Sequence, residues 1–573
     1  MSYFLVNNFN LGIDRRRPIY SAFDGSVWDA VNCHLSRGGD LEKRKAFVQK
    51  YTLPSNAFGL SDASDILYTF GSDPSVSVPS GVVYQQLSHP DGAAMTELLS
   101  ETAYDGAPYV VAKFADGGVY HFNGGNIVTD FVNGIARPAI ATKNAMAIHL
   151  AALINATATL YTAVATSDYV TITAVANNTP FTITAETING GATDNQGITI
   201  SLIQASTGVL PQISRATITG AVEVGDKYAI VLGGVAFGFK NTAPKTPTIV
   251  YTFSSKIYGL ADSLLEFSGT GNAGAWNFNT TGAGFLNLAT NDSGSAMLTG
   301  VEVYQGLLSV FSARNVQIYS VKATPAENAL LQILKNTGTT SPKSVLAYGD
   351  IDVFYLSDSG IRSVRARAPS NAGFVNDIGT TVDDYVRDYR NTLTQEQVNA
   401  ACATIEPLDG RYMLAIGNII MVLSYFPSSQ ISGWTAYATP FIISDFATIG
   451  DKLYCRSGNT VYLYGGDDGQ TYDNSTVSIQ LPFLDGKRAG TGKQMKGIDV
   501  SSTGTWQCEV LVDPRDLTQK LRIGDIDGVT WGALDASAFA YVTHIAPNFT
   551  NTSSGFASIS TVGIAYEAGD EQA

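Results

Sequence analysis

Short apolar runs separated by turn residues recur along most of this chain. Ile66–Phe70 and Pro108–Phe114 are rich in aromatic and β-branched residues, and Asp116-Gly117-Gly118 leads into another such run at Val119–Phe122. Runs of four to eight residues with this composition, bounded by Gly, Asp and Asn, are typical of β-strands and hairpins. We therefore predict a chain built mainly of short antiparallel strands.

The same form returns over the middle of the chain. Asp352–Leu356 turns at Ser357–Gly360 into Ile361–Val364, and Asp451–Cys455 turns at Ser457-Gly458-Asn459 into Val461–Tyr464. Small sheets that close radially satisfy such a pattern. We predict a mainly β fold whose core is a β-propeller, formed by residues 58–136 and 213–480. No strict period is present, so the number of blades is not predicted.

Two stretches interrupt the strands. Residues 142–156 are rich in Ala and carry Met146, Leu150, Leu153 and Ile154 at helical spacing, followed by Thr- and Ile-rich strands. This predicts a small inserted α+β module over 137–212. In a second interruption, Val382–Tyr389 shows helical spacing and Thr394–Gln397 reads as a capping box that opens a short helix. Strands return in a β-rich C-terminal region, 481–573.

Composition narrows the function classes. Of the 573 residues, 45% are hydrophobic and only 15% are charged, a balance that excludes a largely disordered chain. The formal net charge of −15 argues against a general nucleic-acid binder. The four cysteines lie far apart and predict buried thiols in a protein made in a reducing cytoplasm. No apolar run reaches the length of a membrane span.

The first fifty residues differ in charge from the rest. They hold eight Lys and Arg residues against five Asp and Glu residues. We interpret residues 1–57 as an N-terminal docking arm or platform segment that pairs with acidic neighbours. The candidate docking residues are Arg15, Arg16, Arg17, Arg37, Lys43, Arg44 and Lys45.

Catalytic signatures are weak. Gly269–Gly274 matches G-x-G-x-x-G, but strand-like residues follow where a dinucleotide site needs a helix. The five His residues show no metal spacing, and no G-x-S-x-G elbow is present. The members of a Ser/His/Asp triad come together only in the folded protein, so the sequence leaves the possibility of such a triad open. It also leaves open a glycosidase using acid pairs such as Asp467-Asp468, Asp383-Asp384 or Asp350/Asp352. We expect no enzyme activity, no catalytic residue, no metal and no cofactor.

Several segments resemble one family. Phe9–Arg16 followed by Asn32–His34 and Arg37–Arg44 is similar to the start of the tail nozzle proteins of short-tailed bacteriophages (podovirus type), also called tail tubular protein B. Asp352–Val364, Asp409–Phe426 with Gly433-Trp434, and Asp451–Tyr464 resemble later parts of that family. The likeness spans most of the chain and is weakest after residue 480.

The resemblance implies a structural virion protein. Its subunit would form a six-fold ring at the tail tip, below an adaptor or gatekeeper ring, where it would extend the DNA-ejection channel and gate it. Its partners would be copies of itself, the adaptor protein, and tail fibres or spikes, with genomic DNA only as passing cargo. Assembly would take place in the host cytoplasm. The alternative is a virion-associated propeller that binds or degrades glycans.

Overall fold

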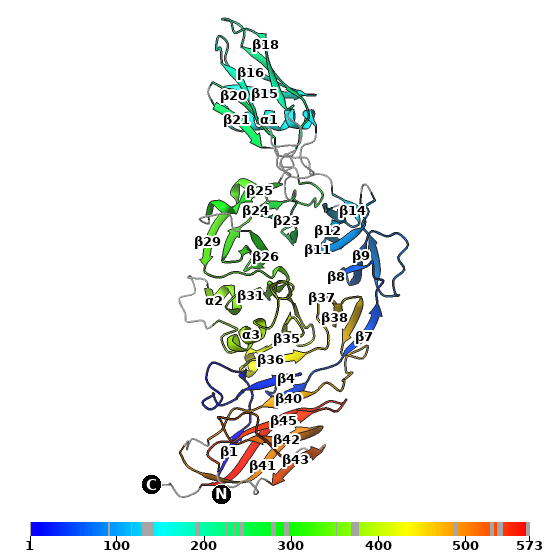
Figure 1. Cartoon of the computed structure of the whole chain (residues 1–573), viewed down its shortest axis with the longest axis vertical. Helices are drawn as coiled ribbons and strands as arrows, with labels where there is room; N and C mark the ends of the chain where they lie inside the picture. Colours follow the sequence, from blue (N-terminus) through cyan, green and yellow to red (C-terminus); the bar gives the residue numbers. More distant parts are fainter. Residues whose placement is uncertain are drawn as a thin grey trace. The chain divides into compact units, whose positions relative to one another are not determined.

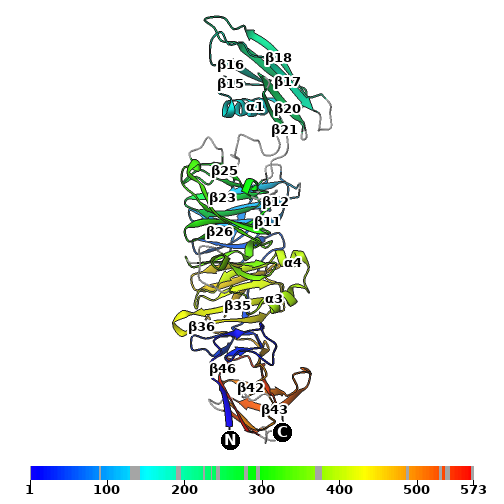
Figure 2. The same ribbon diagram turned by 90° about the vertical axis from the view of Figure 1, so that its left-hand side faces the viewer.

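The fold of the chain is mainly β and divides into two compact units. In the computed structural model, the described residues are 2–89, 92–115, 117–128, 142–188, 195–223, 226–233, 235–240, 246–276, 282–291, 297–350, 352–367, 377–485, 490–527, 532–535 and 542–568. The first unit comprises Met1–Gly117, Ala296–Val321 and Asn328–Ala573, and the second comprises Gly118–Ser295 and Lys322–Glu327. Figure 1 shows the ribbon coloured along the sequence, and Figure 2 shows it turned by 90°.

The first unit contains sheets of a β-propeller, most of them built from strands that follow one another in sequence. Consecutive strands pair antiparallel within β26–β29, β30–β32 and β33–β36, and β11 pairs with β12. In a further sheet, β8 pairs antiparallel with β9, and β10 joins β9 in parallel. The strands are β8 Phe58–Ala63, β9 Ile66–Gly71, β10 Val83–Gln86, β11 Met95–Tyr104, β12 Ala107–Phe114, β26 Leu298–Tyr304, β27 Leu307–Ser312, β28 Asn315–Ser320, β29 Ala329–Lys335, β30 Leu346–Tyr348, β31 Asp352–Ser357, β32 Gly360–Ser363, β33 Cys402–Ile405, β34 Tyr412–Ile416, β35 Ile419–Phe426 and β36 Ile431–Ala438.

One sheet joins distant parts of the chain. Its order is β37 (Asp445–Ile449), β38 (Lys452–Ser457), β39 (Thr460–Tyr464) and then β7 (Phe47–Thr52), so an early strand completes a late sheet. Leu463 lies opposite Val48 in this pairing. The predicted hairpin at 451–464 is confirmed, as is the mainly β propeller fold.

The strands β34 and β35 are buried on both faces. Tyr412, Leu414 and Ile416 point into one hydrophobic cluster, whereas Met413 and Ala415 point into another. Successive side chains of a strand point to opposite faces, so a strand between two packed layers must be apolar throughout. This explains why residues 412–416 and 419–423 are apolar on both sides of the turn at Gly417-Asn418. No helix among the described residues is both long and apolar enough to cross a membrane.

Helices interrupt the propeller where the sequence predicted them. Helix α3 (Asp383–Arg390) buries Val386, and α4 (Gln395–Asn399) begins at Thr394 with the predicted capping box, in which the Thr394 side chain accepts from the backbone N–H of Gln397. The other short helices of the first unit are α2 Val364–Arg367 and the 3-10 helices η4 Pro342–Ser344 and η5 Pro427–Ser429.

The second unit contains one further four-stranded antiparallel sheet, in the order β22-β23-β24-β25. After β24, Gly269–Gly274 forms a tight turn in which Gly269 bridges Asn272, and neither Ala275 nor Trp276 is helical. The elements are β13 Val119–Asn123, β14 Asn126–Ile127, β22 Ile249–Phe253, β23 Lys256–Ala261, β24 Leu264–Phe267, β25 Gly284–Asn287, η2 Leu288–Asn291 and η3 Pro325–Glu327.

The inserted α+β module is larger than predicted. Its helix α1 (Lys143–Thr157) lies against two sheets, β15-β16-β19-β18 and β17-β20-β21. The predicted end at 212 is wrong, because β20 pairs with β17 and its Tyr228 and Ile230 share a core with Met146 and Leu150. The module therefore extends to β21. Its strands are β15 Tyr161–Thr166, β16 Tyr169–Ala174, β17 Ile183–Ile188, β18 Gly197–Gln204, β19 Ile213–Thr219, β20 Lys227–Leu232 and β21 Val235–Lys240.

The N-terminal segment and the C-terminal region form one structure, which we call the platform. One sheet has the order β44-β41-β46-β6-β5, with β1 also on β46; the other continues from β36 through β4, β40, β45, β42 and β43. The strands are β1 Ser2–Val6, β2 Gly12–Ile13, β3 Ser26–Val27, β4 Asp29–Val31, β5 Cys33–Leu35, β6 Leu41–Lys43, β40 Val477–Gln480, β41 Lys493–Thr503, β42 Thr505–Leu511, β43 Lys520–Asp527, β44 Gly532–Asp535, β45 Ala546–Asn551 and β46 Ser558–Ala568. Of the two alternatives predicted for residues 1–57, a docking arm or a platform segment, the strands and hairpin of this segment agree with the platform segment and not with a free arm.

Candidate functional site

Two of the seven candidate docking residues are buried inside the platform. Lys43 is 1% exposed, and its Nζ donates to Oδ1 of Asn551 at 3.2 Å and to the carbonyl of Ser553. Arg44 is 2% exposed; its Nε donates to Oδ1 of Asn32 at 3.0 Å, and its Nη1 lies 3.0 Å from Oδ2 of Asp473. Both cations join distant parts of the chain, so their assignment to an exposed docking surface is wrong.

Arg15, Arg16 and Arg17 are held by aromatic rings at the platform surface. The guanidinium of Arg15 lies 4.9 Å from the ring of Trp28 and 4.6 Å from that of Tyr385. Arg17 lies 3.9 Å above the ring of Phe23. The guanidinium of Arg16 binds the carboxylate of buried Asp14, with Nε 2.9 Å from Oδ1. Arg16 and Arg17 remain exposed, so they keep the predicted ability to meet a partner.

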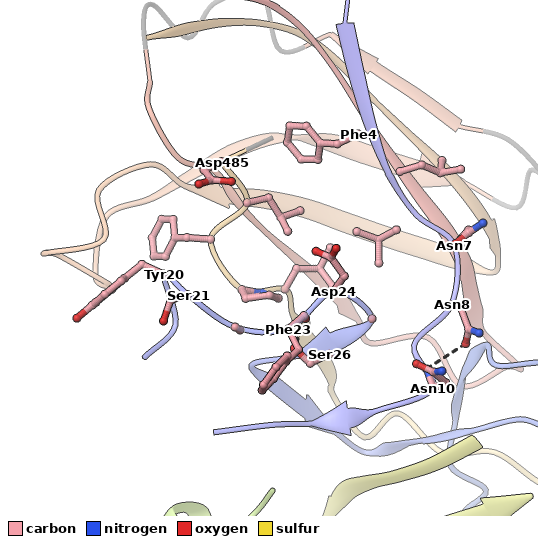
Figure 3. A pocket seen from close by; sticks show the side chains of 18 of the residues that line it. Phe4, Asn7, Asn8, Asn10, Tyr20, Ser21, Phe23, Asp24, Ser26 and Asp485 are labelled. Atoms are coloured by element: carbon pink, nitrogen blue, oxygen red, sulfur yellow. Dashed lines mark hydrogen bonds between the residues drawn. The ribbon is translucent and has the colours of Figure 1, made fainter. Parts of the chain in front are cut away.

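A groove of 780 Å³ runs beside strand β1. It is lined by Tyr3–Asn8 and Asn10 on one side, Tyr20–Ser26 beneath, and Leu481–Asp485 opposite. Figure 3 shows Phe4 pointing into the groove and Tyr20 and Asp485 on its far side. Strand β1 pairs with β46 along one edge only within the described chain. A strand edge beside a groove can accept an added strand through its backbone N–H and C=O groups.

A second cavity, of 390 Å³, lies between the platform and the propeller sheets of the first unit; we call it the polar pocket. The hairpin β5–β6 contributes His34 and Glu42, and Lys45 follows it. The remaining lining residues are Glu406, Asp409, Arg411, Tyr464, Gln470, Tyr472 and Phe556. Of the seven candidate docking residues, Lys45 thus lines this pocket. Arg37 contacts one of the lining residues, with its Nε 3.4 Å from Oδ1 of Asp409.

Hydrogen bonds fix the floor of the polar pocket. The hydroxyl of Tyr437 lies 2.8 Å from Nδ1 of His34 and 3.3 Å from the hydroxyl of Tyr464. Nε2 of His34 lies 3.8 Å from Oε2 of Glu42. Burial, with the nearby charges of Arg411 and Lys45, lowers the pKa of His34 well below its usual value. His34 is therefore neutral at pH 7.

Arg411 organises the carboxylates of the pocket. Its Nη1 lies 2.6 Å from Oδ2 of Asp409 and 3.7 Å from Oε2 of Glu406. Glu406 also accepts from the backbone N–H of Asp409 at 2.9 Å. Burial raises the pKa of Glu42. The pocket thus presents fixed acceptors and donors rather than a nucleophile with an adjacent base.

In each acid pair weighed from the sequence, at least one carboxylate is engaged in structural contacts. Asp467 lies 2.6 Å from Nζ of Lys50, and Asp383 lies 2.7 Å from Nη1 of Arg362. Asp352 accepts from the backbone N–H of Val353 at 2.8 Å and from that of Arg365 at 3.0 Å. No group of three or more His, Cys, Asp or Glu residues in the described part of the chain is placed to hold a metal ion.

Sequence reasoning missed the polar pocket. Its residues come from positions between 34 and 556, and they meet only because the N-terminal hairpin packs against late propeller strands. Among them only Lys45 was a candidate site residue, through its basic cluster; His34, Glu42, Asp409, Arg411 and Tyr464 lie in segments of the family resemblance that assigned them no function. The others carry no local motif.

No protein-family model and no curated protein matches this chain. Solved structures are distantly similar. BamB from Moraxella catarrhalis is 10% identical over 73% of this chain and 99% of its own, with a TM-score of 0.32. YCF48 bound to D1 peptide is 10% identical over 42% of this chain and 74% of its own, with a TM-score of 0.24. A catalytically inactive virginiamycin B lyase from Staphylococcus aureus is 11% identical over 52% of this chain and 96% of its own, with a TM-score of 0.21. Likenesses this remote carry no argument about function.

Proposed function

We propose that this protein is a structural subunit of a bacteriophage tail, the nozzle that forms a six-fold ring below the adaptor ring and extends the DNA-ejection channel. Tail fibres or spikes attach to it, DNA only passes through, and it catalyses no reaction. The proposal rests on the family resemblance of its sequence segments and on how those segments pack together.

One observation carries the proposal: the N-terminal segments of the resemblance share one core with Asp352–Val364 and with Asp409–Phe426 and Trp434, whereas Asp451–Tyr464 packs in other clusters. Gly12 pairs with Trp434, so the first segment meets the segment around Gly433-Trp434. Phe9 and Ile13 lie in the same cluster as Phe354, Tyr412 and Leu423. A chance likeness of scattered segments gives no reason for them to be neighbours, whereas a shared fold does.

The charge of the chain suits a conduit. Each subunit has a formal charge of −15, and a ring multiplies this by its number of copies. Where such charge lines a channel, passing DNA meets charge of its own sign and finds few cations to neutralise its phosphates. The low share of charged residues also suits large subunit interfaces, whose cores are depleted in charge.

The groove beside β1 supplies a docking surface for the neighbouring ring. Tyr3 and Leu5 on this strand are 74% and 49% exposed, and Arg16 and Arg17 lie nearby on Phe23, which lines the groove. We therefore propose β1 and its groove, rather than a free arm, as the docking surface of the N-terminal segment.

Assembly into rings and incorporation into virions test the proposed function. Negative-stain images of the purified protein mixed with its adaptor ring should show six-fold rings, and virions should contain the chain at the tail tip. The double variant Tyr3→Glu/Leu5→Glu should stay folded but lose incorporation, because two carboxylates are brought to the docking edge. Leu331→Glu, at a residue 55% exposed on β29, is the matched control. Virions that lack the wild-type chain would refute the proposed function; normal incorporation of the double variant would refute only the docking edge.

A further inference from the structure

We infer that the polar pocket binds a neutral saccharide. A smaller cavity, of 240 Å³, adjoins the polar pocket and shares Lys45, Glu406, Tyr464 and Gln470 with it. The combined site is therefore long enough for more than one small polar group. The inference concerns a ligand site on the subunit and does not depend on ring assembly.

The pocket holds polar groups with unused hydrogen-bonding capacity. The ammonium of Lys45, the side-chain amide of Gln470 and the hydroxyl of Tyr472 make no side-chain hydrogen bond or ion pair within the described residues. Together these groups offer several donors and acceptors in one cavity. A polyhydroxylated ligand supplies partners of both kinds, because each hydroxyl both donates and accepts.

The charges of the pocket favour an uncharged ligand. Glu42, Glu406 and Asp409 face two cations, Arg411 and Lys45, while His34 is neutral. The adjoining cavity adds Asp451, Asp467 and Asp468 with one further cation, Lys452. Arg411 already contacts both Glu406 and Asp409. An anion would therefore meet the three carboxylates, and a cation would meet Arg411 and Lys45. A neutral ligand avoids this repulsion and still accepts charge-assisted hydrogen bonds.

An aromatic wall completes the site. Tyr472 and Phe556 meet edge to face with their ring centres 5.8 Å apart, and Phe556 is 42% exposed. Such an apolar surface beside convergent polar groups is the usual composition of a small-molecule pocket. A sugar ring has the matching character, with C–H groups on its faces and hydroxyls around its edge.

Saturation-transfer NMR on the full chain tests the inference, with D-glucose, D-galactose, D-mannose and N-acetyl-D-glucosamine as neutral probes and D-glucuronate as the charged one. We expect at least one neutral sugar to bind in the millimolar range and glucuronate to bind more weakly. Tyr472→Ala and Gln470→Ala should each weaken binding by about tenfold. Tyr472→Ala removes a hydroxyl and an aromatic contact with the sugar, and Gln470→Ala removes an amide that can hydrogen-bond to it.

The matched control is Tyr425→Ala, which removes a tyrosine 38% exposed outside the pocket and the groove and should bind as the wild type does. Thermal unfolding of every variant shows whether it is folded. No signal from any neutral sugar at about 50 mM, far above a millimolar Kd, would refute the inference. A preference for glucuronate, or an equal loss in Tyr425→Ala, would also refute it. None of these results bears on ring assembly.

Discussion

Nζ of Lys43 donates to Oδ1 of Asn551, 508 residues further along the chain. Burial lowers the pKa of Lys43, yet the ammonium is satisfied by Asn551 and by the carbonyl of Ser553. This contact ties the N-terminal hairpin to the C-terminal strands at the point where the platform closes.

Replacing Lys43 should therefore destabilise the platform. Lys43→Ala should lower the free energy of unfolding by about 2–3 kcal/mol, because it removes hydrogen bonds to a charged group and leaves buried acceptors without a donor. Lys113→Ala, at a residue whose side chain is 46% exposed, should change it by less than about 0.5 kcal/mol. Urea denaturation measures both. Equal effects would contradict the structural function of Lys43.

A buried charge cluster at Asp445 should make the propeller sensitive to acid. Burial raises the pKa of Asp445, but the attraction of Lys343 and Arg456, at 2.6 and 2.7 Å, outweighs it and lowers the pKa to about 2. The stabilisation is fully present above the carboxyl's ordinary pKa of 3.8 and is lost as pH falls through about 2. Unfolding measured between pH 5 and pH 2 should show this loss.

The same cluster can be tested by substitution. Asp445→Ala leaves Lys343 and Arg456 without their shared carboxylate and should cost about 3–5 kcal/mol at pH 7. Asp467→Asn is the control, since Asp467 is 69% exposed and contacts Lys50 at the surface. A similar small effect from both substitutions would show that the buried cluster contributes little.

Gly12 should tolerate no side chain. It has φ +57°, and a Cβ there would lie 2.4 Å from the carbonyl oxygen of Trp434. Gly458 has φ +56° but no atom within 4 Å of such a Cβ. Gly458→Ala should cost about 1–2 kcal/mol for the left-handed backbone alone, and Gly12→Ala clearly more, since the backbone of β36 must move. The difference between their urea midpoints isolates the close approach.

The four thiols should be unreactive in the folded protein. Cys33, Cys402, Cys455 and Cys508 are all buried, and burial raises the pKa of Cys402 and of Cys508 to about 12. The thiolate is the reactive form. A thiol reagent at pH 8 should label none of the four in native protein and all four in urea. Rapid labelling of the native protein would contradict their burial.

Local patterns predicted most of the elements but not their partners. The capping box at Thr394 and the hairpin at 451–464 depend on residues a few positions apart, so the sequence contains all that determines them. Tyr228–Leu232 reads like a propeller strand, yet it belongs to the inserted module because its partner is β17. Alternation of residue types marks a strand without specifying the neighbouring strand.

The basic cluster at 43–45 shows the same limit for sites. Lys and Arg are rarely fully buried unless paired, so exposure is the natural expectation for them. The partners that bury Lys43 and Arg44 are Asn551 and Asp473, more than 400 residues away. Separations of this size along the chain also explain why the polar pocket has no signature in the sequence.

The contact between Lys43 and Asn551 also sets an order for biosynthesis. A ribosome adds roughly 5–20 residues per second, so the N-terminal hairpin emerges on the order of half a minute to two minutes before the strand that receives its ammonium. Phe9, Ile13 and Leu35 lack most of their apolar neighbours until Phe354 and the later members of their cluster have been made. A chaperone that shields this stretch until translation ends would raise the yield of native subunits.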